Sequence, residues 1–294
     1  MRGSAGSVAV LYVISITGMI SNFLATLTVY HTRYMHSAFG VICALLAVSN
    51  FGVSSLFFLW SALPVHLIFG EHVFGGMPGK IVGQISLFFL YGCEYSHIII
   101  SFNRLVSIAF PMTGQAIFTK RVTTVLVSLI LICAFLEITP YFKPDTCYFT
   151  YDFNTSLWNF ADTECGHFCS FYFDFVSGIV ILAIIFTMDF IAFMLFRRYR
   201  KHANSDKNRS IEKKLFAQSI CQVIPLFCAI LTYHLIGTTQ TSEWGLFLSY
   251  TFSWGMLHAV DGIVLVAFHA RPIDRLVKRL NKVSYHPPGS PFDG

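Results

Sequence analysis

The chain has 294 residues, of which 55% are hydrophobic and 12% are charged, and its mean hydropathy is +0.63. Soluble domains carry about 25% charged residues, so this composition excludes a water-soluble fold, and the 31 Phe residues exclude a disordered chain. The formal net charge of +5 is too small for a nucleic-acid-binding domain, so we expect the lipid bilayer, and no nucleic acid, as a partner.

Seven apolar runs follow one another along the chain, each long enough to cross a bilayer. A hydrocarbon core of about 30 Å needs about 20 helical residues, whereas a β-barrel strand would need about ten. The runs therefore predict helices, over residues 8–30, 39–63, 81–110, 122–142, 168–196, 215–236 and 244–268. We predict an all-α membrane protein, with a seven-transmembrane helix bundle over residues 1–270 and a tail over residues 271–294.

The distribution of Lys and Arg predicts the orientation of these spans. Of the 20 Lys and Arg residues, 17 lie on the side of the bundle that holds the C-terminal tail: in the tail, in the connections after the first, third and fifth spans, and at the end of the third span. The exceptions are Arg2, Lys80 and Lys143. Because cytoplasmic loops carry an excess of Lys and Arg, we expect the N-terminus outside and the C-terminus in the cytoplasm.

The long connection between the fourth and fifth runs has the features of an extracellular loop. Cys147 and Cys165 lie within it and Cys169 lies at its edge, on the side that the charge argument makes oxidising. We expect a disulfide from Cys147 to Cys165 or to Cys169, and we favour Cys165. The same loop contains Asn154 followed by Thr155 and Ser156, which is an acceptor for N-glycosylation.

Ionisable side chains within the spans need partners, since an unpaired one costs a few kcal/mol in a membrane. Glu94 and His97 share one face of the third span, and His258 and Asp261 repeat that spacing in the seventh. Two acid–histidine pairs resemble half of a di-metal carboxylate site, for which Glu137 is the remaining mid-span candidate. We favour hydrogen bonds between helices instead, and we expect no metal or cofactor.

Arg104 stands at the cytoplasmic end of the third span, where a lone Arg would ordinarily extend to the interface. The segment 101–111 around it resembles the third helix of the rhodopsin-like G protein-coupled receptors, which ends in an acidic residue, Arg and Tyr. Other segments resemble the same family in the same order. Residues 18–22 resemble the Gly/Asn motif of the family's first helix, and residues 46–50 resemble the Leu-Ala-x-x-Asp motif of its second helix. Pro225 lies where the family's sixth helix is kinked. Residues 261–265 lie where its seventh helix carries Asn-Pro-x-x-Tyr.

Departures from this pattern narrow the resemblance. Asn103 replaces the acidic residue, and no Cys lies near the outer end of the third span. The order of Asn103, Arg104, Ile108 and Pro111, the self-contained cysteine loop and the Asp-Gly pair in span seven are most similar to the nematode serpentine chemoreceptors of class x. The basic segment 271–282 resembles the short amphipathic helix that follows the last span in this family.

The resemblance implies a chemosensory G protein-coupled receptor rather than an enzyme, in the plasma membrane, with sensory neuron cilia as one location that fits. It implies a small extracellular ligand and a heterotrimeric G protein on the cytoplasmic face. In this family the third-helix Arg is the switch group, so Arg104 is our candidate for that role, and Pro225 lies in the helix that moves. With Asn103 beside Arg104 the intrahelical charge lock should be weaker, which predicts some ligand-independent activity.

The resemblance also implies that two polar residues have exchanged types. The family places an acid in span two and an amide in span seven, whereas this chain has Asn50 and Asp261 there. The two residues either keep one polar contact across the bundle, as part of the activation switch, or are unrelated polar residues.

The outer halves of the spans contain aromatic and His side chains that could line a ligand pocket. The same residues could equally form the bundle core or an aromatic belt at the headgroups. The candidates for ligand binding are Tyr91, Tyr233, His234, Trp244 and Trp254.

Two other classes of function stay open. A small transporter or channel would need a continuous polar path, and the charged positions within the spans are sparse. An intramembrane metal-dependent enzyme would place a metal between the two acid–histidine pairs, Glu94 with His97 and His258 with Asp261.

Overall fold

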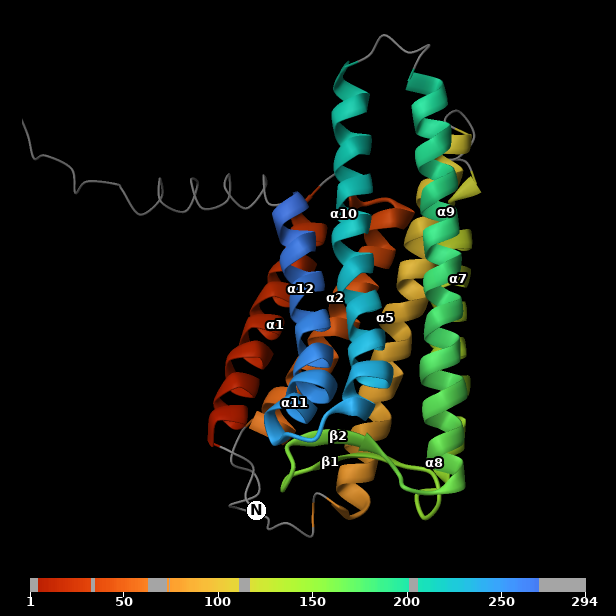
Figure 1. Cartoon of the computed structure of the whole chain (residues 1–294). Coiled ribbons are helices and arrows are strands. Elements are labelled where there is room, and N and C mark those ends of the chain that lie inside the picture. Colours follow the sequence, from red (N-terminus) through yellow and green to blue (C-terminus); the bar gives the residue numbers. More distant parts are fainter. Residues whose placement is uncertain are drawn as a thin grey trace, which may run out of the picture.

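The structure is a computed structural model, which describes residues 5–32, 35–62, 73, 75–110, 117–200 and 206–269. Long helices in these residues pack side by side into one bundle, and a short hairpin of strands lies across one end of it (Figure 1). In chain order the long helices are α1 Ala5–His31, α2 Ala38–Leu56, α5 Met77–Ala109, α7 Lys120–Glu137, α9 Ser177–Arg200, α10 Asp206–Leu231 and α12 Ser253–His269. Together with short helices that adjoin their ends, they overlap each of the seven apolar runs, which confirms the predicted helix bundle. The predicted amphipathic segment 271–282 lies outside the described residues.

Six helical stretches of the described chain are long and apolar enough to cross a membrane. They are Gly6–His31, Ala38–Ala62, Met77–Ala109, Glu164–Arg198, Phe216–Thr239 and Glu243–His269. The seventh long helix, α7, carries three charged residues, with Lys120 and Arg121 in its first turn and Glu137 at its last residue. Most of its exposed side chains between them are nevertheless apolar, among them Val125, Leu129, Ile132 and Leu136. A surface of that kind requires lipid rather than water around it.

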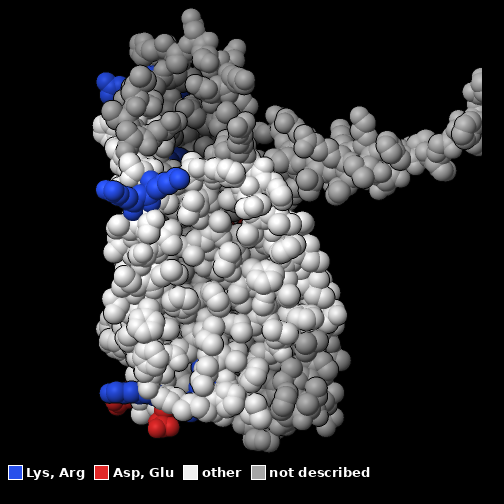
Figure 2. All heavy atoms as spheres, turned by 180° about the vertical axis from the view of Figure 1, so that it is seen from behind, with Lys and Arg blue, Asp and Glu red and all other residues white. Residues whose placement is uncertain are grey.

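The face of the bundle in Figure 2 has an uncharged middle. Figure 2 shows one face, on which the coloured Lys, Arg, Asp and Glu atoms gather toward the two ends and the surface between them is white. Large apolar side chains are exposed on α1, α7 and α9, such as Phe23, Phe135 and Phe186. Helices satisfy their own backbone hydrogen bonds, so this uncharged surface can face hydrocarbon without cost.

Small residues let α1, α2 and α12 approach closely. At Gly18 of α1 a side chain would overlap the Ser54 hydroxyl of α2, and at Gly262 of α12 a Cβ atom would come within 2.8 Å of the Asn22 backbone nitrogen on α1. The Asn22 side chain uses this proximity, since its Nδ2 atom donates to the His258 carbonyl oxygen at 2.9 Å. Close approach of this kind is the usual device of membrane helix packing.

The hairpin consists of β1 Phe149–Asp152 and β2 Leu157–Phe160, which pair antiparallel with Phe149 opposite Phe160. We call the end of the bundle on which it lies the hairpin end. A disulfide between Cys147 and Cys165 closes the loop that carries it, which confirms the favoured pairing, and Cys169 is free. Asn154 is exposed at the turn between the strands.

Four of the described spans change from α-helical to π-helical winding as they reach the hairpin end. Short π-helices occur there as η2 Phe57–Ala62, η4 Cys169–Val176, η5 Thr232–Ile236 and η7 Leu248–Phe252. The remaining short elements are η3 Thr139–Phe142, α8 Glu164–Phe168, η6 Gly237–Thr239 and α11 Glu243–Phe247. Such π-turns frequently mark functional sites because they turn side chains away from the regular helical faces. Here η4 and η5 supply side chains to a cavity.

Candidate functional site

A cavity lies between the helices directly beneath the hairpin. Its volume is about 40 Å³, which is room for roughly three water molecules. The residues that line it come from α5, the hairpin, η4, α10, η5 and α12: Leu87, Leu90, Glu94, Phe149, Phe160, Asp174, Leu226, Ala229, Ile230, Tyr233, His234, Ser253, Trp254 and Leu257. A ligand of more than a few heavy atoms therefore requires some of these side chains to move.

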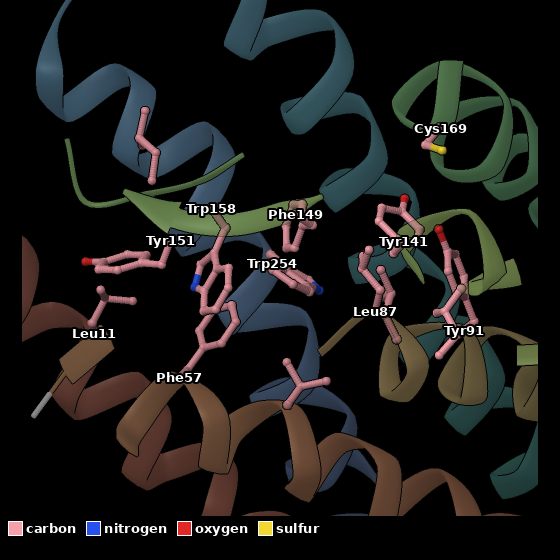
Figure 3. Packing of buried hydrophobic residues seen from close by; sticks show 14 of the residues in the cluster. Leu11, Phe57, Leu87, Tyr91, Tyr141, Phe149, Tyr151, Trp158, Cys169 and Trp254 are labelled. Carbon is pink, nitrogen blue, oxygen red and sulfur yellow. The ribbon is translucent and has the colours of Figure 1, made fainter. Parts of the chain in front are cut away.

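The hairpin covers the cavity with a stack of aromatic rings. Trp158 of β2 stacks on Phe57 and on Phe149, with ring centroids 5.5 Å apart in each case, and Trp254 of α12 meets it edge-on at 5.9 Å (Figure 3). Burial raises the pKa of Tyr151, on β1, to about 12, so this side chain is neutral at physiological pH. The underside of the hairpin is thus an apolar, aromatic surface.

Backbone contacts hold this cover in place. At Gly83 of α5 a side chain would overlap the carbonyl oxygen of Phe149, so the strand lies directly on the helix. Thr251 of η7 donates to the Ser156 carbonyl oxygen at 2.9 Å and accepts from the Trp158 amide at 3.2 Å. The position of the hairpin is therefore coupled to the helices that flank the cavity.

Two carboxyl groups and one imidazole line the cavity. Asp174 of η4 accepts a hydrogen bond from His234 of η5 at 2.9 Å, which joins the fifth and sixth spans at the hairpin end. Glu94 of α5 is 3% exposed, and its Oε2 atom is buried with no hydrogen-bond partner. Among the described residues that line the cavity, none is Lys or Arg.

The predicted ligand-binding residues separate into two groups. Tyr233, His234 and Trp254 line the cavity, and the Tyr233 hydroxyl also donates to the Trp158 carbonyl oxygen at 3.4 Å. Tyr91 is fully buried in the aromatic cluster away from the lining, and Trp244 of α11 is 46% exposed. Three of the five candidates thus line the cavity, and the outer position of an aromatic residue in the sequence does not tell which way its helix is rotated.

A polar network crosses the middle of the bundle and joins α2, α5 and α12. Asn50 donates to Asp261 at 3.2 Å, and His97 lies 3.0 Å from the same carboxylate oxygen. The Asn50 amide oxygen lies 2.5 Å from His258 Nδ1 and accepts from the Cys93 thiol at 3.3 Å. Of the two alternatives for Asn50 and Asp261, the structure shows the direct contact.

This network changes the interpretation of the acid–histidine pairs. His97 pairs with Asp261 and His258 with Asn50, while Glu94 faces the cavity. Glu137 of α7 accepts a hydrogen bond from the Tyr95 hydroxyl at 2.6 Å. In the described part of the chain, the group whose side chains approach one another closely enough for a metal consists of three cysteines near the hairpin, two of which form the disulfide. His97, His258, Asp261 and Glu137 therefore form hydrogen bonds between helices, whereas Glu94 does not.

At the opposite end of the bundle Arg104 forms a buried ion pair. Its Nη1 atom donates to Asp189 of α9 at 2.7 Å, and the two side chains are 3% and 11% exposed. Ser219 of α10 donates to the other carboxylate oxygen of Asp189. The third, fifth and sixth spans are thus joined by the side chains of Arg104, Asp189 and Ser219, and we call this contact the Arg104 tie.

The Arg104 tie bears on the expectation about the neighbouring residue Asn103, which stays a prediction. Asn103 is buried beside Arg104, and the absence of an acid at position 103 suggested a weak charge lock. The carboxylate is supplied by Asp189 from another helix, which the sequence argument missed although an acid inside an apolar run is visible. Arg104 is still incompletely paired, since Nε and Nη2 are buried without partners. Pro225 lies inside α10 between this tie and the cavity.

Comparisons with known proteins bear on this arrangement. The sequence matches the family described as "Serpentine type 7TM GPCR chemoreceptor Srx" over residues 12–269. It is 24% identical to "Serpentine receptor class X 45" of Caenorhabditis elegans over 214 residues, which cover 66% of this chain and 57% of that relative. It is also 24% identical to "Serpentine receptor class X-43" of the same organism over 267 residues, which cover 86% of this chain and 81% of the relative. The chain thus matches little more than half the length of the first of these relatives.

A solved structure shares the fold. The crystal structure of squid rhodopsin superposes with a TM-score of 0.72 over 93% of this chain and 79% of the rhodopsin chain. The two sequences are 17% identical, so the likeness concerns the arrangement of helices. The cavity, the polar network and the Arg104 tie are features of this chain's own residues.

Proposed function

Because the chain belongs to the Srx family of serpentine seven-transmembrane G protein-coupled chemoreceptors, we propose that it binds a small extracellular molecule in the cavity and signals to a heterotrimeric G protein. This family consists of receptors, not enzymes. The observation that carries the proposal is the cavity beneath the hairpin, lined by the same α5 and α10 that hold the Arg104 tie at their other ends.

The proposal includes an orientation and a location. The hairpin end faces outward and the Arg104 tie faces the cytoplasm of a plasma membrane, with sensory cilia as one location that fits. A disulfide between Cys147 and Cys165 supports this orientation, because such bonds form in oxidising compartments. Asn154 is exposed at the hairpin turn, which is consistent with a glycan at this position.

Activation follows from differential binding of the ligand to two conformations. A ligand that enlarges the cavity acts on η5 and α12, which carry Tyr233, His234 and Trp254. The polar network around Asn50 and Asp261 lies on the path from α12 to α5, where a change in packing alters its hydrogen bonds. Separation of α10 from Asp189 then frees Arg104 and opens a groove for a helix of the G protein.

A cell-based assay tests the proposal. The receptor is expressed in a heterologous cell with a G protein reporter and exposed to a panel of small volatile and water-soluble compounds, with surface abundance measured in parallel. Ala229 lines the cavity, so Ala229→Leu should abolish the response to any active compound while basal signalling and surface abundance stay normal. A response that survives this substitution would place the binding site elsewhere.

A matched control uses Ala192, which is also a buried alanine but lies on α9 outside the cavity lining. Ala192→Leu introduces the same extra volume into a packed interface. A loss of response in both variants at reduced surface abundance would indicate misfolding rather than a filled cavity. A loss confined to Ala229→Leu supports the proposed site.

A further inference from the structure

Glu94 is a carboxyl group without a partner in the middle of an apolar membrane protein. It lies on α5, is 3% exposed, and its buried Oε2 atom accepts no hydrogen bond from any described residue. An ionised carboxylate in such surroundings is unfavourable by several kcal/mol unless a cation or several donors reach it. The side chain lines the cavity, so a bound molecule can supply the missing partner.

The other carboxyl and imidazole groups near the cavity have hydrogen-bond partners of their own. Asp174 is bound by His234 at 2.9 Å, and Glu137 accepts from Tyr95 at 2.6 Å. Among the described residues of the lining, the formal charges are therefore acidic, with His234 already engaged by a carboxylate. The electrostatic field in the cavity favours a positive group on the ligand and disfavours an anion.

Aromatic rings complete the surroundings that a cation prefers. Phe149, Phe160, Tyr233 and Trp254 all line the cavity, so aromatic rings and the unpaired Glu94 carboxyl group border the same small volume. A cation over an aromatic face gains further stabilisation once it is desolvated. Metal ions are a poorer match, because calcium takes six to eight oxygen ligands and the site offers far fewer.

We infer, on the basis of the receptor function proposed above, that the cavity binds a small organic amine whose ammonium group pairs with Glu94 and whose carbon skeleton packs under the aromatic cover. The 40 Å³ volume favours a compact molecule. Larger amines bind only when the hairpin shifts with them.

The test measures binding on the purified full chain in lipid nanodiscs. Small primary and tertiary amines are compared with neutral alcohols and ethers of the same carbon skeleton, and the shift in unfolding temperature is recorded for each. We expect amines to raise the unfolding temperature and their neutral counterparts to leave it unchanged. Equal stabilisation by both series, or stabilisation by neither, would overturn the inference.

Substitutions at two carboxyl groups locate the effect. Glu94→Gln should weaken amine binding at least about tenfold, as expected for a charge-assisted bond, and should raise the unfolding temperature of the unliganded protein. Glu94→Asp should retain part of the affinity. Glu137→Gln removes a nearby carboxyl group that does not line the cavity, and should bind amines as the parent does. Parental affinity in Glu94→Gln, or equal losses in both Gln variants, would contradict the inference.

The purified-protein readout separates this inference from the proposed signalling function. If amines bind in a Glu94-dependent way but no G protein responds in cells, the signalling proposal fails and the binding inference stands. If cells respond through the cavity to neutral compounds alone, the receptor function stands and the amine inference fails.

Discussion

The Arg104 tie makes a quantitative prediction about basal signalling. Asp189→Asn keeps the shape of the side chain and one acceptor oxygen but removes the charge that faces Arg104 at 2.7 Å. Removal of one partner from a buried ion pair costs about 3–5 kcal/mol. The amide still accepts one hydrogen bond, so we expect the closed conformation to lose roughly 2–3 kcal/mol.

In the open conformation of the proposed function, Arg104 no longer contacts Asp189, so this conformation loses little by the same substitution. A relative change of about 2–3 kcal/mol multiplies the open-to-closed ratio by roughly 30 to 140. If about 1% of the parent receptor is open without ligand, which is a typical minor population, the variant would be roughly 20–60% open. Ser219→Ala removes only a hydrogen bond to Asp189, about 1 kcal/mol, and should raise the ratio roughly fivefold.

The assay is ligand-free G protein signalling per receptor at the cell surface. Asp174→Asn serves as the matched control, since it makes the same chemical change in the same span at the hairpin end, away from the tie. Asp174→Asn should leave basal signalling low. Asn103→Asp should change basal signalling little, because Asp189 already supplies a carboxylate to Arg104. Parental basal signalling in Asp189→Asn at normal surface abundance would refute the reasoning.

Two further predictions concern the loop and the polar network. Cys147→Ser should lower the free energy of unfolding by about 3 kcal/mol, which is the usual effect of losing a short-loop disulfide. Cys165→Ser should lower it less, because the Cys169 sulfur lies 3.7 Å from the Cys147 sulfur and can replace the lost partner. Thermal unfolding and mapping of the disulfides by mass spectrometry check this, and equal losses in both variants would contradict it. Asn50→Asp should reduce surface abundance because it places a second carboxyl group beside Asp261, and adding Asp261→Asn should restore it. A double variant no better than Asn50→Asp would show that the contact does not matter.

The sequence predicted the features of the fold that depend on one helix at a time, namely the number and approximate positions of the spans. Apolar runs of about twenty residues locate the spans because the bilayer imposes that length on any helix. The partner of Cys147 could be narrowed to Cys165 or Cys169, because few cysteines lie in this connection, and the structure shows the favoured Cys165. The hairpin was not predicted, since four-residue strands inside a connecting loop leave a weak signal that is easily taken for an irregular loop.

Contacts between helices could not be predicted in the same way. The i, i+3 spacing of Glu94 and His97 places them near one face, yet one lines the cavity and the other reaches Asp261 on α12. A difference of a few tens of degrees around the helix decides which neighbour a side chain meets. The same reason explains why Trp254 lines the cavity and Tyr91 does not.

The two acidic residues of the fifth span show what the sequence leaves open and what the fold adds. Asp174 and Asp189 are about fifteen residues apart, or roughly 22 Å of helix, and each contacts the sixth span, one through His234 and the other through Ser219. The fifth and sixth spans are therefore joined near both ends, with Pro225 between the two contacts. One contact borders the cavity and the other holds Arg104. Under the proposed function, we expect a ligand that strengthens the first contact and turns α10 about it to strain the second. This geometry gives a physical route from the cavity to the Arg104 tie that requires no contact between the ligand and Arg104.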